Sequence, residues 1–124
     1  VGEGRGFVRF TDDRDTMNRV VVGSELAGGI TVELVSLDEC LAAESPALLK
    51  IDVEGFEEEV LRGLSTTLQD ARCRAVLCEV HFGILDARGQ RQAPARIAQQ
   101  LRECGFSTRW VDSSHLAATR PVRT

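Results

Sequence analysis

The sequence lacks the long apolar runs and the basic excess that mark two large classes of protein. No stretch approaches the ~20 consecutive apolar residues that a membrane-spanning helix needs, so we predict no membrane partner. Its 15 Lys and Arg face 19 Asp and Glu, which gives a net charge of −4 and disfavours a dedicated nucleic-acid-binding protein. Lys50 is the only lysine, so arginine supplies nearly all of the positive charge.

The sequence also lacks cysteines at the spacings that metal and redox motifs use. Its four cysteines are Cys40, Cys73, Cys78 and Cys104. None forms a C-x-x-C pair, and no Cys/His pair has zinc-finger spacing. We therefore expect reduced thiols without a structural disulfide, and a cytoplasmic location.

Length and composition indicate one globular domain over residues 1–124. Hydrophobic residues make up 43% and charged residues 27%, values typical of a folded protein rather than a disordered one. The sequence opens at Val1 without a methionine or a signal peptide. We expect it to be a piece of a longer protein.

The pattern of residues changes at about residue 36. Residues 1–35 are rich in glycine and β-branched side chains and predict a hairpin-rich segment, with strands at residues 7–10, 19–22 and 30–35. From residue 36 on, predicted strands at 48–53, 75–80, 106–111 and 115–119 alternate with helices. The helices are expected after the capping box Ser36-x-x-Glu39, over residues 56–70, and from Pro94 to Gly105. Residues 36–124 therefore predict a βαβαβ unit with a parallel sheet.

Polar side chains interrupt or follow two of the predicted strands. Asp52 and Glu54 come at the end of the first parallel strand, and Glu79 and His81 at the end of the second. Each pair is two residues apart on an extended chain, so its members share a face. Ligands of open α/β sheets bind outside the carboxyl ends of the strands, and Gly55 permits a tight turn there. These residues are the candidate site.

Each candidate also has a structural interpretation. Asp52 and Glu54 could cap the following helix, Glu79 could pair with an arginine, and His81 could be a polar surface group. The glutamates at residues 57–59 are interpreted as a solvated helix start that matches the helix dipole. Asp52, Glu79 and His81 could also hold magnesium or manganese, but we predict no metal site.

A longer motif surrounds these residues. Residues 50–57 read K-I-D-V-E-G-F-E, and residues 60–63 read V-L-R-G. Together they resemble the signature of the FkbM-type methyltransferases. Residues 35–39 resemble the segment just upstream of that signature, residues 76–80 the next strand, and residues 115–121 the closing strand. The resemblance covers residues from about 7 to 121.

The resemblance implies an S-adenosylmethionine-dependent enzyme that methylates a hydroxyl oxygen of a small molecule or sugar. It implies an α/β fold with a Rossmann-like sheet, mostly parallel, with helices on both faces and incomplete on its N-terminal side. The family's glycine-containing cofactor loop belongs upstream and is absent, so we expect this chain alone to bind S-adenosylmethionine poorly. The uncovered sheet edge could pair with a second copy.

The resemblance also assigns residues to roles. Asp52 would position or deprotonate the acceptor, with Glu79 and His81 as catalytic helpers. Glu54 and Gly55 would lie on the cofactor side. A substrate-side hairpin would contain Asp13, Asn18 and Arg19.

Two alternatives remain open. One is a non-catalytic methyltransferase remnant that binds a ligand or pairs with itself. The other is a receiver-like domain, because Asp12 and Asp13 followed by Asp52 mimic its phosphoacceptor cluster. However, residues 17–29 lack helical periodicity, and no lysine follows a later strand.

Overall fold

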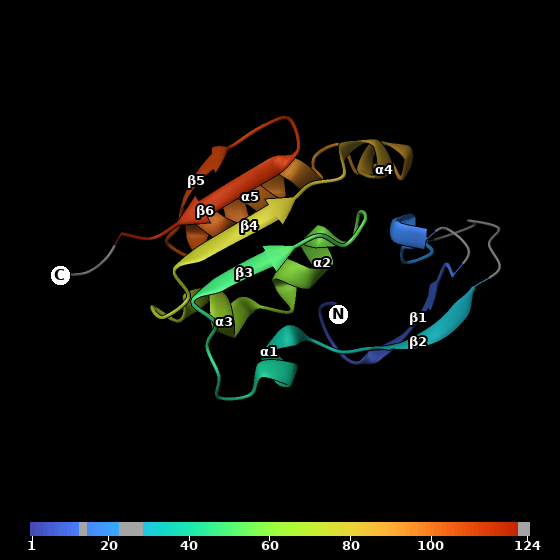
Figure 1. The fold of residues 1–124 in the computed structure, drawn as a ribbon, viewed down its shortest axis with the longest axis horizontal. Helices are drawn as coiled ribbons and strands as arrows, with labels where there is room; N and C mark the ends of the chain where they lie inside the picture. The colour runs from blue at the N-terminus through green and yellow to red at the C-terminus, as the bar shows by residue number, and fades with distance from the viewer. Residues whose placement is uncertain (13–14, 23–28, 122–124) are drawn as a thin grey trace.

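A two-stranded hairpin forms the N-terminal part of the molecule. The structure is a computed structural model that describes residues 1–12, 15–22 and 29–121 (Figure 1). Strands β1 (Gly6–Phe10) and β2 (Ile30–Leu34) pair antiparallel, with Gly6 opposite Leu34. Both strands were predicted. Among the described residues between them, 15–17 form a 3-10 turn, η1 (Asp15–Met17), and 19–22 form only an isolated bridge, through Val20, instead of the predicted strand.

A separate four-stranded sheet carries the strands of the second half. Its order is β3 (Leu48–Ile51), β4 (Ala75–Glu79), β6 (His115–Thr119) and β5 (Ser107–Trp110). Strands β3 and β4 are parallel, whereas β6 is antiparallel to both β4 and β5. The sheet is therefore mixed rather than mostly parallel. The cause is the short connection over residues 111–114, because only antiparallel neighbours can be joined so tightly.

Only one face of this sheet is fully buried. Helices α2 (Glu57–Arg62), α3 (Ser65–Gln69) and α5 (Ala93–Glu103) lie behind it in Figure 1. The strand residues facing them are Ile51, Val76, Cys78, Leu116 and Ala118, each at most 3% exposed. Their neighbours along the strands point the other way and are exposed or half-buried, and Leu48 is 64% exposed. For the described residues, the prediction of helices on both faces is wrong.

The predicted helix over residues 56–70 is two helices, α2 and α3, with a break at Gly63. The backbone N–H of Asp38 donates to the Gly63 carbonyl at 2.9 Å. A Cβ atom at Gly63 would lie 1.8 Å from the carbonyl oxygen of Gly2, so the N-terminal segment crosses the chain at this point. Long-range contacts therefore interrupt a helix whose apolar spacing alone is continuous.

The remaining helices are short, apart from α5. Helix α1 (Leu37–Leu41) begins as predicted at Ser36, whose hydroxyl accepts the backbone N–H of Glu39 at 3.2 Å. Helix α4 (Phe82–Ala87) was not predicted, since it buries only Leu85 and has no side-chain cap. In the described part of the chain, no helix has the length and apolar character needed to cross a membrane.

All four cysteines are free thiols, as predicted. Cys78 lies on the buried face of β4, and burial raises the pKa of its thiol to about 12. A thiol with so high a pKa is a poor nucleophile. Cys78 is therefore a packing residue of the hydrophobic core.

Candidate functional site

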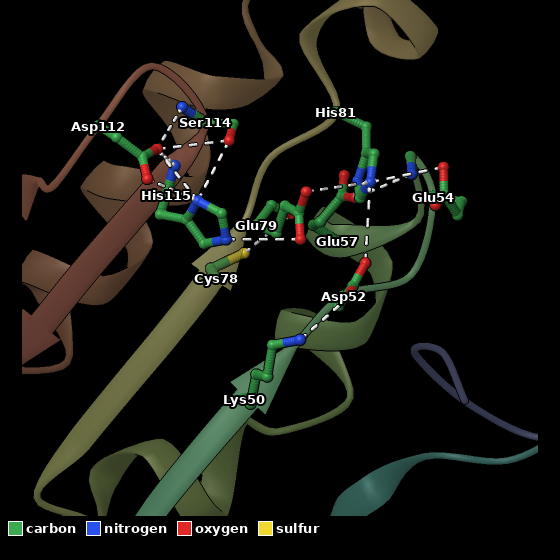
Figure 2. Close-up of polar contacts among 11 residues, drawn as sticks. Lys50, Asp52, Glu54, Glu57, Cys78, Glu79, His81, Asp112, Ser114 and His115 are labelled. Carbon is green, nitrogen blue, oxygen red and sulfur yellow. Dashed lines mark hydrogen bonds and ion pairs between the residues drawn. The ribbon is translucent and has the colours of Figure 1, made fainter. Parts of the chain in front are cut away.

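The parallel pair β3 and β4 brings the predicted site residues to one edge of the sheet. Asp52 directly follows β3, Glu79 is the last residue of β4, and His81 comes two residues later. Strand β6 begins at the same edge, where His115 pairs with Glu79. Figure 2 shows these side chains converging from separate strands and loops.

His81 is the centre of the cluster. Its Nδ1 lies 2.6 Å from Oε1 of Glu57. Its Nε2 lies 3.4 Å from Oε2 of Glu54, 3.7 Å from Oδ1 of Asp52 and 4.0 Å from Oε1 of Glu79. Figure 2 shows the ring between these carboxylates, and the side chain is 15% exposed. The structure thus brings together the four ionisable residues predicted for catalysis and cofactor binding.

The sequence interpretation missed Glu57. It is fully buried rather than solvated, and its Oε1 also accepts the backbone N–H of Gly55 at 2.8 Å. Because an ionised carboxylate can only accept, we assign the ring hydrogen of His81 to Nδ1. This leaves Nε2 directed at the other carboxylates. The available signal was the motif itself, in which Glu57 is the last residue.

Several carboxylates tune the charge on His81. Burial alone would lower the pKa of the imidazole. The hydrogen bond to Glu57 and the negative charges of Glu57, Glu54 and Glu79 outweigh burial and raise the pKa above its ordinary value. The site therefore favours a positive charge at this position.

A tight loop holds the acidic residues in place. Glu54 and Gly55 both have positive φ, 50° and 88°. A Cβ atom at Gly55 would lie 2.6 Å from Cγ2 of Ile84, so only glycine fits without displacing α4. Arg88 donates from Nη1 to the Gly55 carbonyl at 3.0 Å and from Nη2 to the Val20 carbonyl at 2.7 Å. It thereby joins the loop to the hairpin segment.

A second histidine extends the cluster along the sheet edge. Nε2 of His115 lies 3.5 Å from Oε2 of Glu79, and its Nδ1 lies 3.0 Å from Asp112. Asp112 also accepts the backbone N–H groups of Ser114 and His115, and these bonds lower the pKa of its carboxyl to about 2. Figure 2 shows this group beside the His81 cluster, with Glu79 between them.

A cavity of about 410 Å³ borders the site on the hairpin side. Apolar side chains of β1 and β2, among them Val8, Phe10 and Val32, line one wall, and Asp52 and Glu54 line the other. Of the predicted substrate residues, Asn18 lines this cavity and Arg19 does not. Asp13 is not among the residues that the structure describes.

Comparison with known proteins identifies the family of this chain. The chain matches the Methyltransferase FkbM domain over residues 4–108, and it belongs to this family of methyltransferases. It is 37% identical over 84 residues to "Hexuronic acid methyltransferase AglP" of Haloferax volcanii. That match covers 65% of this chain and 31% of the relative, so the chain spans less than a third of the relative's length. No solved structure matches the chain significantly. The predicted family is confirmed.

Proposed function

We propose that the chain forms the acceptor side of an S-adenosylmethionine-dependent O-methyltransferase. The observation that carries this proposal is the convergence of Asp52, Glu54, Glu79 and His81 beside the apolar cavity, in a chain of the FkbM family. A small hydroxylated molecule is the proposed acceptor. The name of the relative points to a sugar acid as one class to test.

The acidic surroundings suit the cofactor chemically. S-adenosylmethionine supplies a methyl group on a cationic sulfonium, and Glu54 presents a carboxylate in the cavity wall next to the turn at Gly55. Negative charge at this wall favours binding of a cation. We therefore keep Glu54 and Gly55 as the proposed cofactor-side residues of this chain.

Asp52 is the proposed base or positioning group. Its carboxylate lines the cavity, and its Oδ2 accepts a hydrogen bond from Nζ of Lys50 at 3.2 Å. Lys50 thus orients one oxygen and leaves the other toward His81. When the acceptor oxygen bonds to the methyl carbon, the C–S bond breaks and the hydroxyl proton must leave. A carboxylate within hydrogen-bond reach can take it.

The decisive experiment compares Asp52→Asn with the wild-type protein. Methyl transfer from labelled S-adenosylmethionine to hydroxylated sugars and sugar acids is followed, and cofactor binding is measured by calorimetry. We expect turnover to fall roughly a hundredfold or more while cofactor affinity stays within a few-fold. Glu103→Gln, an exposed residue at the end of α5, is the control. Wild-type turnover in Asp52→Asn would overturn the assignment.

One observation favours a second function, self-association. Strand β3 is an outer strand of the four-stranded sheet as described, and Leu48 on it is 64% exposed. An open strand edge can pair with a second copy. Light scattering across a concentration series tests this function, and a monomer at all concentrations would contradict it. A dimer that gives no calorimetric heat with S-adenosylmethionine would favour the non-catalytic module.

A further inference from the structure

Three side chains of the site lie at a spacing that suits a metal ion. Asp52, Glu54 and His81 each offer one ligand atom, and these atoms all lie within 4.8 Å of one another. Two ligands about 2.1 Å from a shared ion lie about 3.0 Å apart when adjacent and about 4.2 Å apart when opposite. The observed 3.4 Å and 3.7 Å separations from Nε2 of His81 lie between these two values. Small side-chain rotations would close the site.

The fully buried Glu57 supplies an independent observation. Its Oε1 binds Nδ1 of His81, and its Oε2 is buried with no hydrogen-bond partner among the described residues. Metal-bound histidines usually donate their other ring N–H to a carboxylate, which fixes the ring and makes the ligating nitrogen more basic. A buried carboxylate with one unpartnered oxygen also leaves negative charge that a nearby cation would offset.

The net negative charge of the cluster also favours a bound cation. Four carboxylates surround the His81 ring, those of Asp52, Glu54, Glu57 and Glu79. Apart from the His81 ring, Lys50 is the one cationic side chain paired with Asp52 in the described structure. Even with a protonated ring, the cluster would keep a net negative charge. A divalent cation neutralises such a group where a proton cannot.

We propose that Asp52, Glu54 and His81 bind one divalent cation of the Mn²⁺ type, through two carboxylate oxygens and Nε2. Carboxylates suit Mg²⁺ and Mn²⁺, and the imidazole nitrogen shifts the preference toward the transition metal. Glu79, at 4.0 Å from Nε2, is a fourth ligand within reach. The set considered from the sequence was Asp52, Glu79 and His81, and no metal site was predicted. In the structure Glu54 lies nearer to Nε2 of His81 than Glu79 does.

The site has a use in the reaction, and this part of the inference rests on the proposed function. Asp52 and Glu54 belong to the cavity wall, so a cation held by them borders the cavity. A cation there would bind the acceptor oxygen and lower the pKa of its hydroxyl. It would also let the cavity wall that carries Asp52 and Glu54 accept the carboxylate of a sugar acid.

The first test is Mn²⁺ titration of the chain, with free Mn²⁺ followed by electron paramagnetic resonance and no cofactor present. We expect one Mn²⁺ per chain, and a loss of affinity of roughly tenfold or more in Asp52→Asn, Glu54→Gln and Glu57→Gln. Glu59→Gln, on the same helical turn as Glu57, is the matched control and should bind like the wild type. Weak binding in the wild type, or equal affinity in all variants, overturns the proposal.

The second test identifies the nitrogen ligand and works even if a cluster variant fails to fold. The chain has two histidines, His81 and His115. Pulsed resonance of bound Mn²⁺ detects a directly bonded ¹⁴N nucleus. We expect this signal in the wild type and in His115→Gln, and not in His81→Gln. Its loss in His115→Gln, or its absence from the wild type, overturns the assignment. Neither test uses methyl transfer, so Mn²⁺ binding without turnover would count against the proposed function alone.

Discussion

Three consecutive glutamates at the start of α2 occupy three different environments. Glu57 is fully buried against His81. Glu58 is 5% exposed and bonds to Arg96 and Arg62. Glu59 is half-buried, and burial raises the pKa of its carboxyl. Within one helical turn, Glu57 therefore belongs to the candidate site, Glu58 pairs with two arginines, and Glu59 lies partly at the surface.

Glu58 makes a testable contribution to stability. Its carboxylate accepts hydrogen bonds from Nε and Nη2 of Arg96 at 2.7 and 2.9 Å. The bond from Arg96 lowers the pKa of Glu58, although burial opposes the shift. We expect Glu58→Gln to lower the free energy of unfolding by about 1–2 kcal/mol at pH 7, because Arg96 and Arg62 lose the charged acceptor to which they donate.

The pH dependence of the stability difference between the wild type and Glu58→Gln shows whether the charge of Glu58 causes it. A carboxyl with a lowered folded-state pKa stabilises the fold above its unfolded pKa of about 4.3, and this stabilisation is lost as pH falls through the folded-state value. Urea unfolding of wild type and Glu58→Gln should therefore differ at pH 7 and converge below about pH 4. A constant difference across that range would mean that packing, rather than charge, is responsible.

At the scale of the elements, local pattern predicted most strands and helices but not how they join. The hairpin strands, β3, β4 and α5 follow from periodicity and turn residues, and α1 follows from Ser36. The break at Gly63 depends on Gly2, which is distant in sequence. The place of β6 between β4 and β5 depends on sheet pairing that no local window contains.

Asp38 shows how two of these elements are joined. It belongs to α1, but its carboxylate accepts the backbone N–H groups of Thr66 and Thr67 at 2.7 and 2.9 Å. It also accepts the hydroxyl of Thr67 at 2.7 Å. Asp38 thus satisfies the open N–H groups at the start of α3, as an N-cap residue would.

We expect Asp38→Ala to destabilise the protein by about 1–2 kcal/mol, the usual cost of a lost helix cap. Its neighbour Glu39 is the control. The Glu39 carboxylate pairs with Arg5, whose side chain is 70% exposed, so Glu39→Ala should destabilise the protein less than Asp38→Ala because solvent screens that pair. Urea unfolding of both variants measures the difference. Equal losses would show that Asp38 does not cap α3.

At the scale of the whole molecule, the candidate site lies between two sheets that share no strand. Parallel strand ends made the convergence of Asp52, Glu54, Glu79 and His81 predictable from the sequence. Glu57 was missed because a first-turn glutamate ordinarily faces solvent. The resemblance implied a substrate-side hairpin, and Asn18 of that segment does line the cavity. Local pattern alone did not show the cavity, because its walls come from the hairpin and from the loop after β3, which are far apart in the chain.

Arg88 ties these two parts together through the carbonyls of Gly55 and Val20, so its loss should loosen the hairpin segment selectively. We expect Arg88→Met, which keeps an apolar stem, to speed hydrogen exchange at the amides of Thr11 and Val21 roughly tenfold. Exchange in β4 should not change. Arg91→Met is the control, because Arg91 is exposed and pairs with Asp86 at the surface. Equal exchange in the two variants would mean that the hairpin keeps its place, and the cavity its wall, without Arg88.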